Sequence, residues 1–174
     1  MRLAPFLALV LPTLSIAADF DSKTWMYKGC KVHVTVGKRE AASIGTFLVT
    51  VAAPTGKRAT LRADRDGTLS GAWADDIDGD GKFEVMVWSQ SAGSGSYGKV
   101  GVFTWTGSTL KNRVVPELNA SQMAGYMGHD QFSVTRSQLY RSFPTFKQKD
   151  NDPAVKTGMR TLRLNLKKFR WESA

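Results

Sequence analysis

Alternation of apolar and other residues recurs along much of the chain and predicts β-strands. A strand places successive side chains on opposite faces, so an apolar residue at every second position builds one buried face. Residues 160–171 show this well, because Leu162, Leu164 and Leu166 share one face while Arg and Lys largely occupy the other. Other segments that alternate or are rich in β-forming residues are 31–36, 46–52, 59–63, 83–89 and 99–105.

Turn residues separate these predicted strands at short intervals. The turn signals are the runs 53–56, 64–67, 78–81 and 106–108, each of which combines glycine with proline, aspartate, serine or threonine. The one helical candidate is the short, weakly amphipathic stretch 117–125. Many short strands with little helix predict an all-β fold, either an antiparallel sandwich or a barrel.

The first seventeen residues predict a cleavable secretory signal peptide. Arg2 gives a positive start, residues 4–16 are almost entirely apolar, and small residues follow at 15–17. The apolar run is too short to span a bilayer, which takes about 20 residues. The cleavage point carries no cysteine that could take a lipid anchor. We therefore expect residues 18–174 to form one exported, soluble β domain without a membrane anchor.

The chain is strongly basic, with 24 Lys and Arg against 15 Asp and Glu and a net charge of +9. Removing residues 1–17 takes away only the charge of Arg2 and leaves +8. This balance favours an anionic partner, and export argues for acidic proteins or envelope polymers and against nucleic acid. The single cysteine, Cys30, cannot form an internal disulfide. His33 lies three residues further along a strand and so faces the other way, which argues against a catalytic pair.

The most informative segment is Ser91–Gly98, SAGSGSYG, between two predicted strands. Its glycines match the spacing of dinucleotide-binding and protein kinase loops, but no helix follows and the other kinase motifs are missing from the sequence. It is better interpreted as a hairpin loop that exceeds the usual length of about two to five residues. Its hydroxyls, free amides and Tyr97, a residue type enriched at binding hot spots, suit insertion into a cleft lined with carboxylates.

This loop and its surroundings resemble the periplasmic inhibitors of invertebrate-type (I-type) lysozyme. The resemblance covers roughly residues 45–166. The segments that carry it are Asp76–Gly81 with Glu84, then Ser91–Gly98, Gly125–Asp130 and Arg141–Pro144.

The resemblance implies a periplasmic β-sandwich with no enzymatic activity and no cofactor, which inhibits an I-type lysozyme by pushing the loop into its active-site cleft. Ser94 and Tyr97 would be the inserted contacts. Lysozyme chemistry depends on two carboxyl groups, which hydroxyl and amide donors can satisfy. Whether the protein is a monomer or a homodimer stays open. The residues expected to bind lysozyme are Ser94, Gly95, Ser96, Tyr97, Tyr126 and His129.

The acidic run at residues 76–81 looks like the start of a calcium loop. An EF-hand needs a bidentate acid at its twelfth position, where this chain has Val87. A tight Asp–Gly turn is the favoured interpretation, and no functional metal is expected. The ligands that calcium would find here are Asp76, Asp78, Asp80 and Glu84.

Two other classes of function compete with inhibition. A binding module for envelope glycans or an anionic polymer would use exposed aromatic residues and a solvated basic face. Affinity for peptidoglycan without an effect on lysozyme would identify it. An exported hydrolase would need an acid–base pair or a metal cluster that the sequence does not show. The basic cluster considered for the binding module is Arg136, Arg141, Lys147 and Lys149.

Overall fold

The computed structural model of the chain describes residues 19–148 and 153–174, so the predicted signal peptide at residues 1–17 lies outside the described residues. The described part is almost entirely β-structure, which confirms the all-β prediction. None of its helical structure is long and apolar enough to cross a membrane. The elements are β1 (Ser22–Tyr27), β2 (Cys30–Val36), β3 (Ile44–Ala52), β4 (Arg58–Asp66), β5 (Thr68–Asp75), β6 (Phe83–Gln90), β7 (Gly98–Trp105), β8 (Leu110–Arg113), α1 (Ala120–Met123), β9 (Gln131–Thr135), β10 (Gln138–Lys147), β11 (Val155–Asn165) and β12 (Arg170–Ser173).

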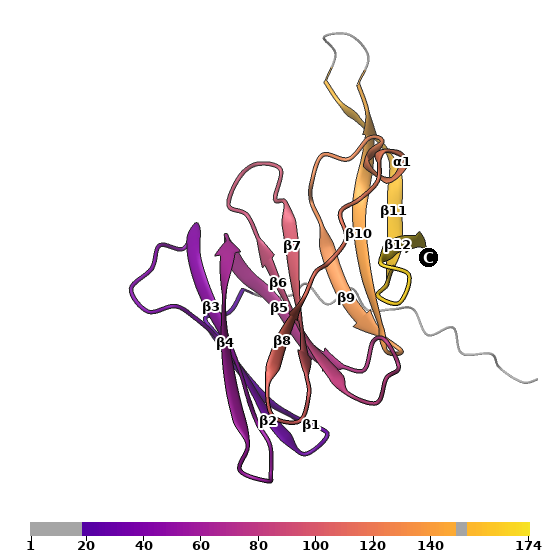
Figure 1. Ribbon diagram of the computed structural model, residues 1–174. Coiled ribbons are helices and arrows are strands. Elements are labelled where there is room, and N and C mark those ends of the chain that lie inside the picture. The colour runs from indigo at the N-terminus through magenta and orange to yellow at the C-terminus, as the bar shows by residue number, and fades with distance from the viewer. Residues whose placement is uncertain (1–18, 149–152) are drawn as a thin grey trace, which may run out of the picture.

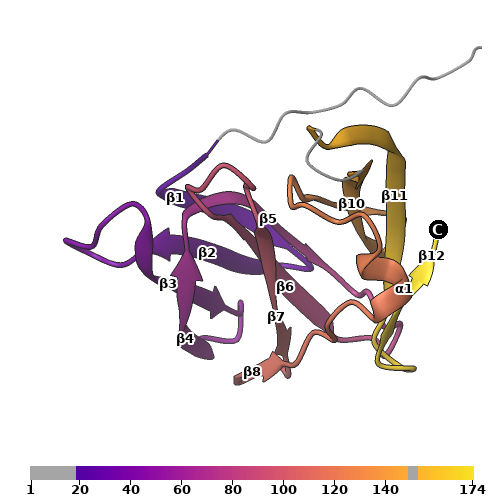
Figure 2. The same ribbon diagram turned by 90° about the horizontal axis from the view of Figure 1, so that it is seen from above.

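The strands form three antiparallel sheets, each built from four consecutive strands. The first sheet has the order β1-β2-β3-β4, the middle sheet β5-β6-β7-β8, and the third sheet β12-β11-β10-β9. The middle sheet lies between the other two, so the fold is a sandwich of three layers (Figures 1 and 2). Of the two predicted architectures, the chain adopts the sandwich.

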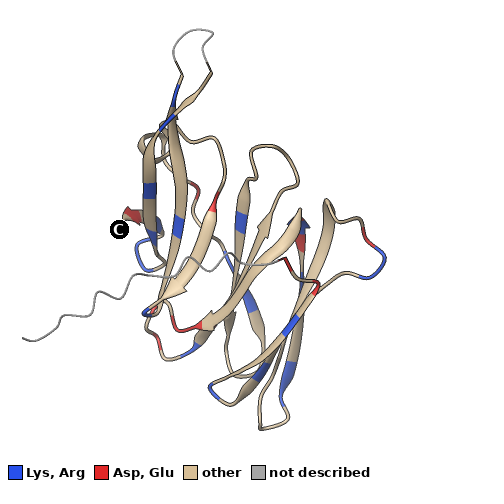
Figure 3. Ribbon diagram, turned by 180° about the vertical axis from the view of Figure 1, so that it is seen from behind, with Lys and Arg blue, Asp and Glu red and all other residues tan. Residues whose placement is uncertain are grey.

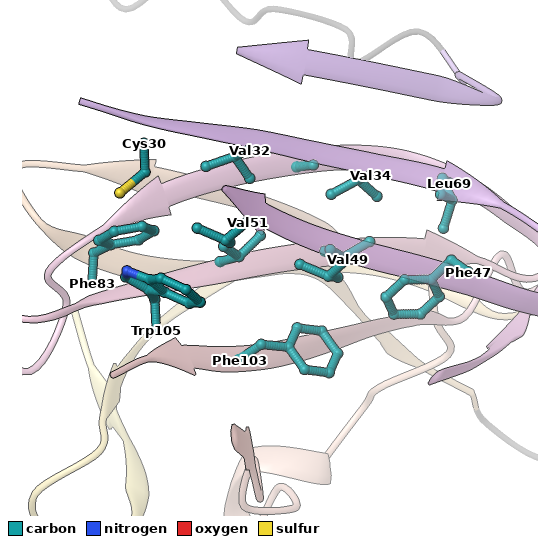
Figure 4. Close-up of a cluster of buried hydrophobic side chains, with 13 residues drawn as sticks. Cys30, Val32, Val34, Phe47, Val49, Val51, Leu69, Phe83, Phe103 and Trp105 are labelled. Atoms are coloured by element: carbon teal, nitrogen blue, oxygen red, sulfur yellow. The ribbon is translucent and has the colours of Figure 1, made fainter. Parts of the chain in front are cut away.

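The first apolar core fills the space between the first and middle sheets (Figure 4). Val32 and Val34 of β2, and Val49 and Val51 of β3, are completely buried, as their alternation predicts. The middle sheet closes this core with Leu69, Ala72, Phe83, Val85, Val87, Phe103 and Trp105.

Strand β6 is buried on both faces and therefore belongs to two cores. Val85 and Val87 pack in the first core, whereas Met86 and Trp88 pack in a second core between the middle and third sheets. Burial of a large apolar side chain contributes about 1.5–3 kcal/mol, so packing on both faces makes β6 a centre of stability. The third sheet supplies Phe132, Leu139, Phe143, Leu162, Leu164, Leu166 and Trp171 to the second core.

The structure divides the strand predicted over residues 160–171 into a hairpin. β11 ends at Asn165 and β12 begins at Arg170. The Asn165 side chain accepts the N–H of Lys168 at 2.9 Å, and Phe169 has a positive φ of 50°, so both stabilise a turn. The helix predicted at 117–125 is also shorter than expected, since the helical part of this stretch is limited to α1 at Ala120–Met123.

The expected turn at residues 64–67 is a sharp corner at a single glycine. Asp64 to Asp66 still belong to β4, and only Gly67, with φ +87°, separates β4 from β5. A Cβ at residue 67 would lie 1.7 Å from the carbonyl oxygen of Gln90, the last residue of β6. The corner where the chain passes from the first sheet to the middle sheet therefore packs against the end of β6, where the Gly-Ser loop begins.

Candidate functional site

The loop between β6 and β7, residues 91–97, is closed by hydrogen bonds of its own. The Ser91 N–H donates to the Tyr97 carbonyl at 2.9 Å, and the Tyr97 N–H donates back to the Ser91 hydroxyl at 3.0 Å. At the tip, the Ser96 N–H donates to the Gly93 carbonyl at 2.9 Å, and Ser96 has a positive φ of 42°. These bonds give the loop a defined shape, unlike a flexible Gly-Ser connection.

A second loop, residues 125–130, lies against the first. The His129 N–H donates to the Gly95 carbonyl at 2.6 Å. The rings of Tyr97 and Tyr126 meet edge to face with their centroids 5.8 Å apart. The structure thus brings together residues that are about thirty positions apart in the sequence, and Tyr126 and His129 lie beside the predicted binding loop.

The six predicted binding residues differ in how much of each side chain a partner could reach. Ser94 and His129 are exposed, and Tyr97 has 51% of its surface exposed. Gly95, Ser96 and Tyr126 are half-buried. The Ser96 carbonyl accepts the side-chain amide of Gln90 at 3.2 Å. A partner could therefore reach the side chains of Ser94, Tyr97 and His129 most readily, while the other three residues offer less exposed surface.

Beneath the two loops lies a charged cluster centred on Asp130, which is completely buried. One carboxylate oxygen accepts the Gly98 N–H at 2.8 Å and the Tyr126 hydroxyl, and the other accepts Nε of Arg141 at 2.7 Å. Arg141 also donates to the Tyr126 hydroxyl at 2.9 Å. Burial raises the pKa of the Tyr126 phenol, and its bond to the Asp130 carboxylate raises that pKa further. The base of the loop is thus tied to the third sheet.

Arg141 does not belong to a solvated basic face, and the prediction that placed it there is wrong. Only 12% of its side chain is exposed, and its guanidinium lies 5.3 Å from the ring centre of Tyr126, 5.6 Å from that of Phe132 and 5.7 Å from that of Phe143. Burial of this charge is tolerated because Asp130 neutralises it and the rings contact its faces. More generally, Figure 3 shows Lys and Arg spread over the sheets and connecting turns.

Sequence reasoning missed the pairing of Asp130 with Arg141. Asp130 immediately precedes β9, and Arg141 pairs with Phe132 in the antiparallel register of β9 and β10. The available signal was Arg141 within a strand whose neighbours Leu139 and Phe143 are apolar and on the same face. An arginine in the apolar stripe of a strand indicates a buried partner.

The acidic turn brings three of the four candidate calcium ligands together. Oxygen atoms of Asp76, Asp78 and Glu84 lie within 4.8 Å of one another, whereas Asp80 is not part of this group. Such carboxylates have the chemistry that calcium prefers. The Asp80 carboxylate instead accepts the N–H of Lys82 at 2.8 Å.

These carboxylates also have partners within the protein. Asp76 accepts the N–H of Gly81 at 3.0 Å, and Asp78 lies 3.5 Å from Arg113. The buried Glu84 accepts the Ile77 N–H at 3.2 Å and the Thr104 hydroxyl at 3.0 Å. Burial, together with the nearby charges of Asp78 and Asp80, raises the pKa of Glu84 to about 7. The arrangement fits a tight Asp–Gly turn that sets the start of β6.

Cys30 and His33 lie on opposite faces of β2, as the sequence predicts. Cys30 is buried in the first core, whereas the imidazole of His33 is hydrogen-bonded through Nδ1 to the Thr24 hydroxyl at 2.7 Å. The thiol therefore has no access to the histidine as a base, and this strand offers no nucleophilic pair.

Two solved structures are similar to this chain. One is the periplasmic lysozyme inhibitor PliI-Ah of Aeromonas hydrophila, 29% identical, covering 52% of this chain and 83% of that chain, with a TM-score of 0.47. The other is Aeromonas hydrophila PliI in complex with Meretrix lusoria lysozyme, 28% identical, covering 52% of this chain and 80% of that chain, with a TM-score of 0.47. A comparison with curated proteins gives no match.

The family of periplasmic lysozyme inhibitors of I-type lysozyme matches residues 18–124. The span expected from the sequence is residues 45–166. The match begins earlier, because it takes in the whole first sheet, and it also ends earlier, ahead of the second loop and the third sheet. It includes the loop at residues 91–97 and covers more than half of the chain. The protein therefore belongs to the family of periplasmic lysozyme inhibitors of I-type lysozyme, which are not enzymes.

Proposed function

We propose that this I-type lysozyme inhibitor works by inserting the loop at residues 91–97 into the active-site cleft of the enzyme. The observation that carries the proposal is a hydrogen-bonded, outward-directed loop whose exposed side chains include Ser94 and Tyr97. Hydroxyl and amide donors on this loop would meet the two carboxyl groups on which glycoside hydrolysis depends and would exclude the substrate.

The shape of the loop in the free protein favours tight binding. Ordering a flexible loop on association opposes affinity, and a loop that is already held by internal hydrogen bonds avoids much of that cost. The bonds between Ser91 and Tyr97 close the base, and the contact of Gly95 with His129 holds the tip region. Because this cost is reduced, insertion of the loop can give stable binding even when the interface with the enzyme is small.

The six residues have different roles in this proposal. Ser94 and Tyr97 are the inserted contacts, with the tyrosine acting as a rigid aromatic anchor of the kind that dominates interface energies. Gly95 and Ser96 shape the loop. Tyr126 supports the Tyr97 ring, and His129 adds a flanking contact from the second loop.

The test is inhibition of an I-type lysozyme by the protein without residues 1–17 and by its Ser94→Ala/Tyr97→Ala variant. We expect stoichiometric inhibition by the parent and its loss in the variant, with chicken-type and goose-type lysozymes assayed in parallel. A matched control is Ser108→Ala/Tyr140→Ala, which removes the same groups from the turn after β7 and from β10. Full potency of the loop variant would exclude insertion as the mechanism. Binding of either protein to peptidoglycan without inhibition would favour a glycan-binding function.

A further inference from the structure

We infer that Asp130 and Arg141 are positioning residues for inhibition, which hold the loop at residues 91–97 in its binding shape from the third sheet. This inference rests on the proposed insertion of the loop. Both residues lie beyond the family-matched range of 18–124, so the last part of the chain acquires a role in the inhibitory site.

Two adjacent residues, His129 and Asp130, hold the loop at two points. His129 donates its N–H to the Gly95 carbonyl near the loop tip, and the Asp130 carboxylate accepts the Gly98 N–H where the loop enters β7. The segment 129–130 therefore bridges the tip and the base. Any shift of Asp130 would move both contacts together.

Asp130 itself is tightly fixed. It accepts three donors, one each from Gly98, Tyr126 and Arg141, and it has no exposed surface. Bonds to a buried carboxylate are shorter and stronger than bonds between neutral groups. Arg141 is fixed in turn between aromatic rings, so the cluster gives the loop a rigid support.

The segment 128–130 approaches the loop and the start of β7 too closely for a side chain at residue 98 or 128. A Cβ at residue 98 would lie 2.7 Å from the Cβ of Asp130, and a Cβ at residue 128 would lie 1.9 Å from the Gly95 carbonyl oxygen. Glycine at 128 lets backbone lie against backbone, and glycine at 98 lets the Asp130 side chain approach the start of β7. The loop and the segment that leads into the third sheet therefore fit closely against each other, with no space for larger residues at positions 98 and 128.

The ion pair of Asp130 and Arg141 has a positioning role distinct from a purely structural one. The third sheet is already held by an apolar core that includes the completely buried Leu139 and Phe143. Buried ion pairs are poor stabilisers in general, because apolar residues of similar size often serve stability equally well. The pair lies at the base of the loop, and a role in holding the shape of the loop explains this position.

The decisive variant is Asp130→Asn. An amide has one acceptor oxygen, so its nitrogen must face a donor from either Arg141 or Gly98. We expect inhibition of I-type lysozyme to weaken at least tenfold and hydrogen exchange of the amides of residues 91–98 to accelerate. The amides of Leu139 and Leu162 in the third sheet should keep their protection. The matched control is Arg163→Gln, which breaks the partly exposed Arg163–Glu172 pair of the same sheet.

The exchange measurement is made without lysozyme, so it tests the loop support even where insertion itself fails. A folded Asp130→Asn protein with unchanged loop exchange, or with unchanged potency, overturns the inference. Loss of protection throughout the third sheet also overturns it, since that shows a general structural role. If Asp130→Asn does not fold, Tyr126→Phe tests the inference in the same assays. This variant removes one donor to Asp130 and leaves the ring against Tyr97.

Discussion

Gly128 lies against Gly95 with no room for a side chain between them. A Cβ at residue 128 would sit 1.9 Å from the Gly95 carbonyl oxygen, and Gly128 has a φ of +86°. Gly95 lies in the β6–β7 loop of the middle sheet, and Gly128 lies between α1 and β9, so their contact joins the family-matched part of the chain to the part that follows it. The contact therefore offers a direct way to disturb the loop.

Gly128→Ala should lower inhibition by displacing the loop at residues 91–97. The substitution combines a positive φ, which costs about 1 kcal/mol for alanine, with a clash against the loop backbone. Gly56→Ala is the matched control, because Gly56 has a φ of +83° and no atom lies within 4 Å of the Cβ that alanine would add there. Inhibition assays and thermal melts of both variants separate strain from clash. Equal potency of the two would show that the loop tolerates the displacement.

The central position of β6 predicts a large stability effect at Met86. This side chain is completely buried in the second core, and truncation of such a residue to alanine costs about 2–5 kcal/mol. Met159→Ala is the control, since that methionine is 54% exposed on β11 and should change the free energy of unfolding little. Urea denaturation of both variants measures the difference. A small loss for Met86→Ala would mean that the third sheet contributes little to folding.

Calcium should leave the melting temperature unchanged. The carboxylate of Asp76 already accepts amide N–H groups, and Asp78 is paired with Arg113. A bound ligand stabilises a protein in proportion to the logarithm of its concentration over its dissociation constant. Melts in calcium, in magnesium and in chelator should therefore coincide. A saturable rise with calcium alone, lost in Asp78→Asn, would contradict this prediction.

The strands and the loop followed from local sequence, because both depend on residues close together in the chain. Alternation located β2, a run of β-forming residues located β3, and the excess length of the Gly-Ser segment identified the loop. The third layer was harder to foresee. Residues 83–89 read as one strand, and only the fact that Met86 and Trp88 are apolar as well as Val85 and Val87 indicated burial on both faces.

The support of the loop could not be derived in the same way. Asp130 and Arg141 meet through the pairing of β9 with β10, and Gly98 reaches them through packing of the middle sheet on the third. Charged residues are mostly exposed, so a basic residue is assigned to the surface unless its partner is known. The position of Arg141 between the apolar Leu139 and Phe143 indicates a buried partner, but only the packing of the sheets identifies that partner as Asp130.

The buried carboxyl group of Glu84 should make the protein less stable as the pH rises from about 4.5 to 7. Its pKa is raised from 4.5 to about 7, mainly by burial and to a smaller extent by the charges of Asp78 and Asp80. Below pH 4.5 the group is protonated in both the folded and the unfolded chain. Between the two values the unfolded chain has lost this proton while the folded chain keeps it, so the free energy of unfolding falls with pH. The loss approaches about 3 kcal/mol, at about 1.4 kcal/mol per pH unit.

Urea denaturation between pH 4 and 8 measures this slope, and Glu84→Gln should flatten it. The control is Glu172→Gln, because hydrogen bonds from Asn165 and Arg170 lower the pKa of Glu172 to about 2. Its contribution is present above pH 4.5 and is lost only as the pH falls toward 2, outside the window of Glu84. A slope that survives in Glu84→Gln would assign the pH dependence to another group. A flattened slope in that variant alone would identify the buried carboxyl of β6 as the group that titrates.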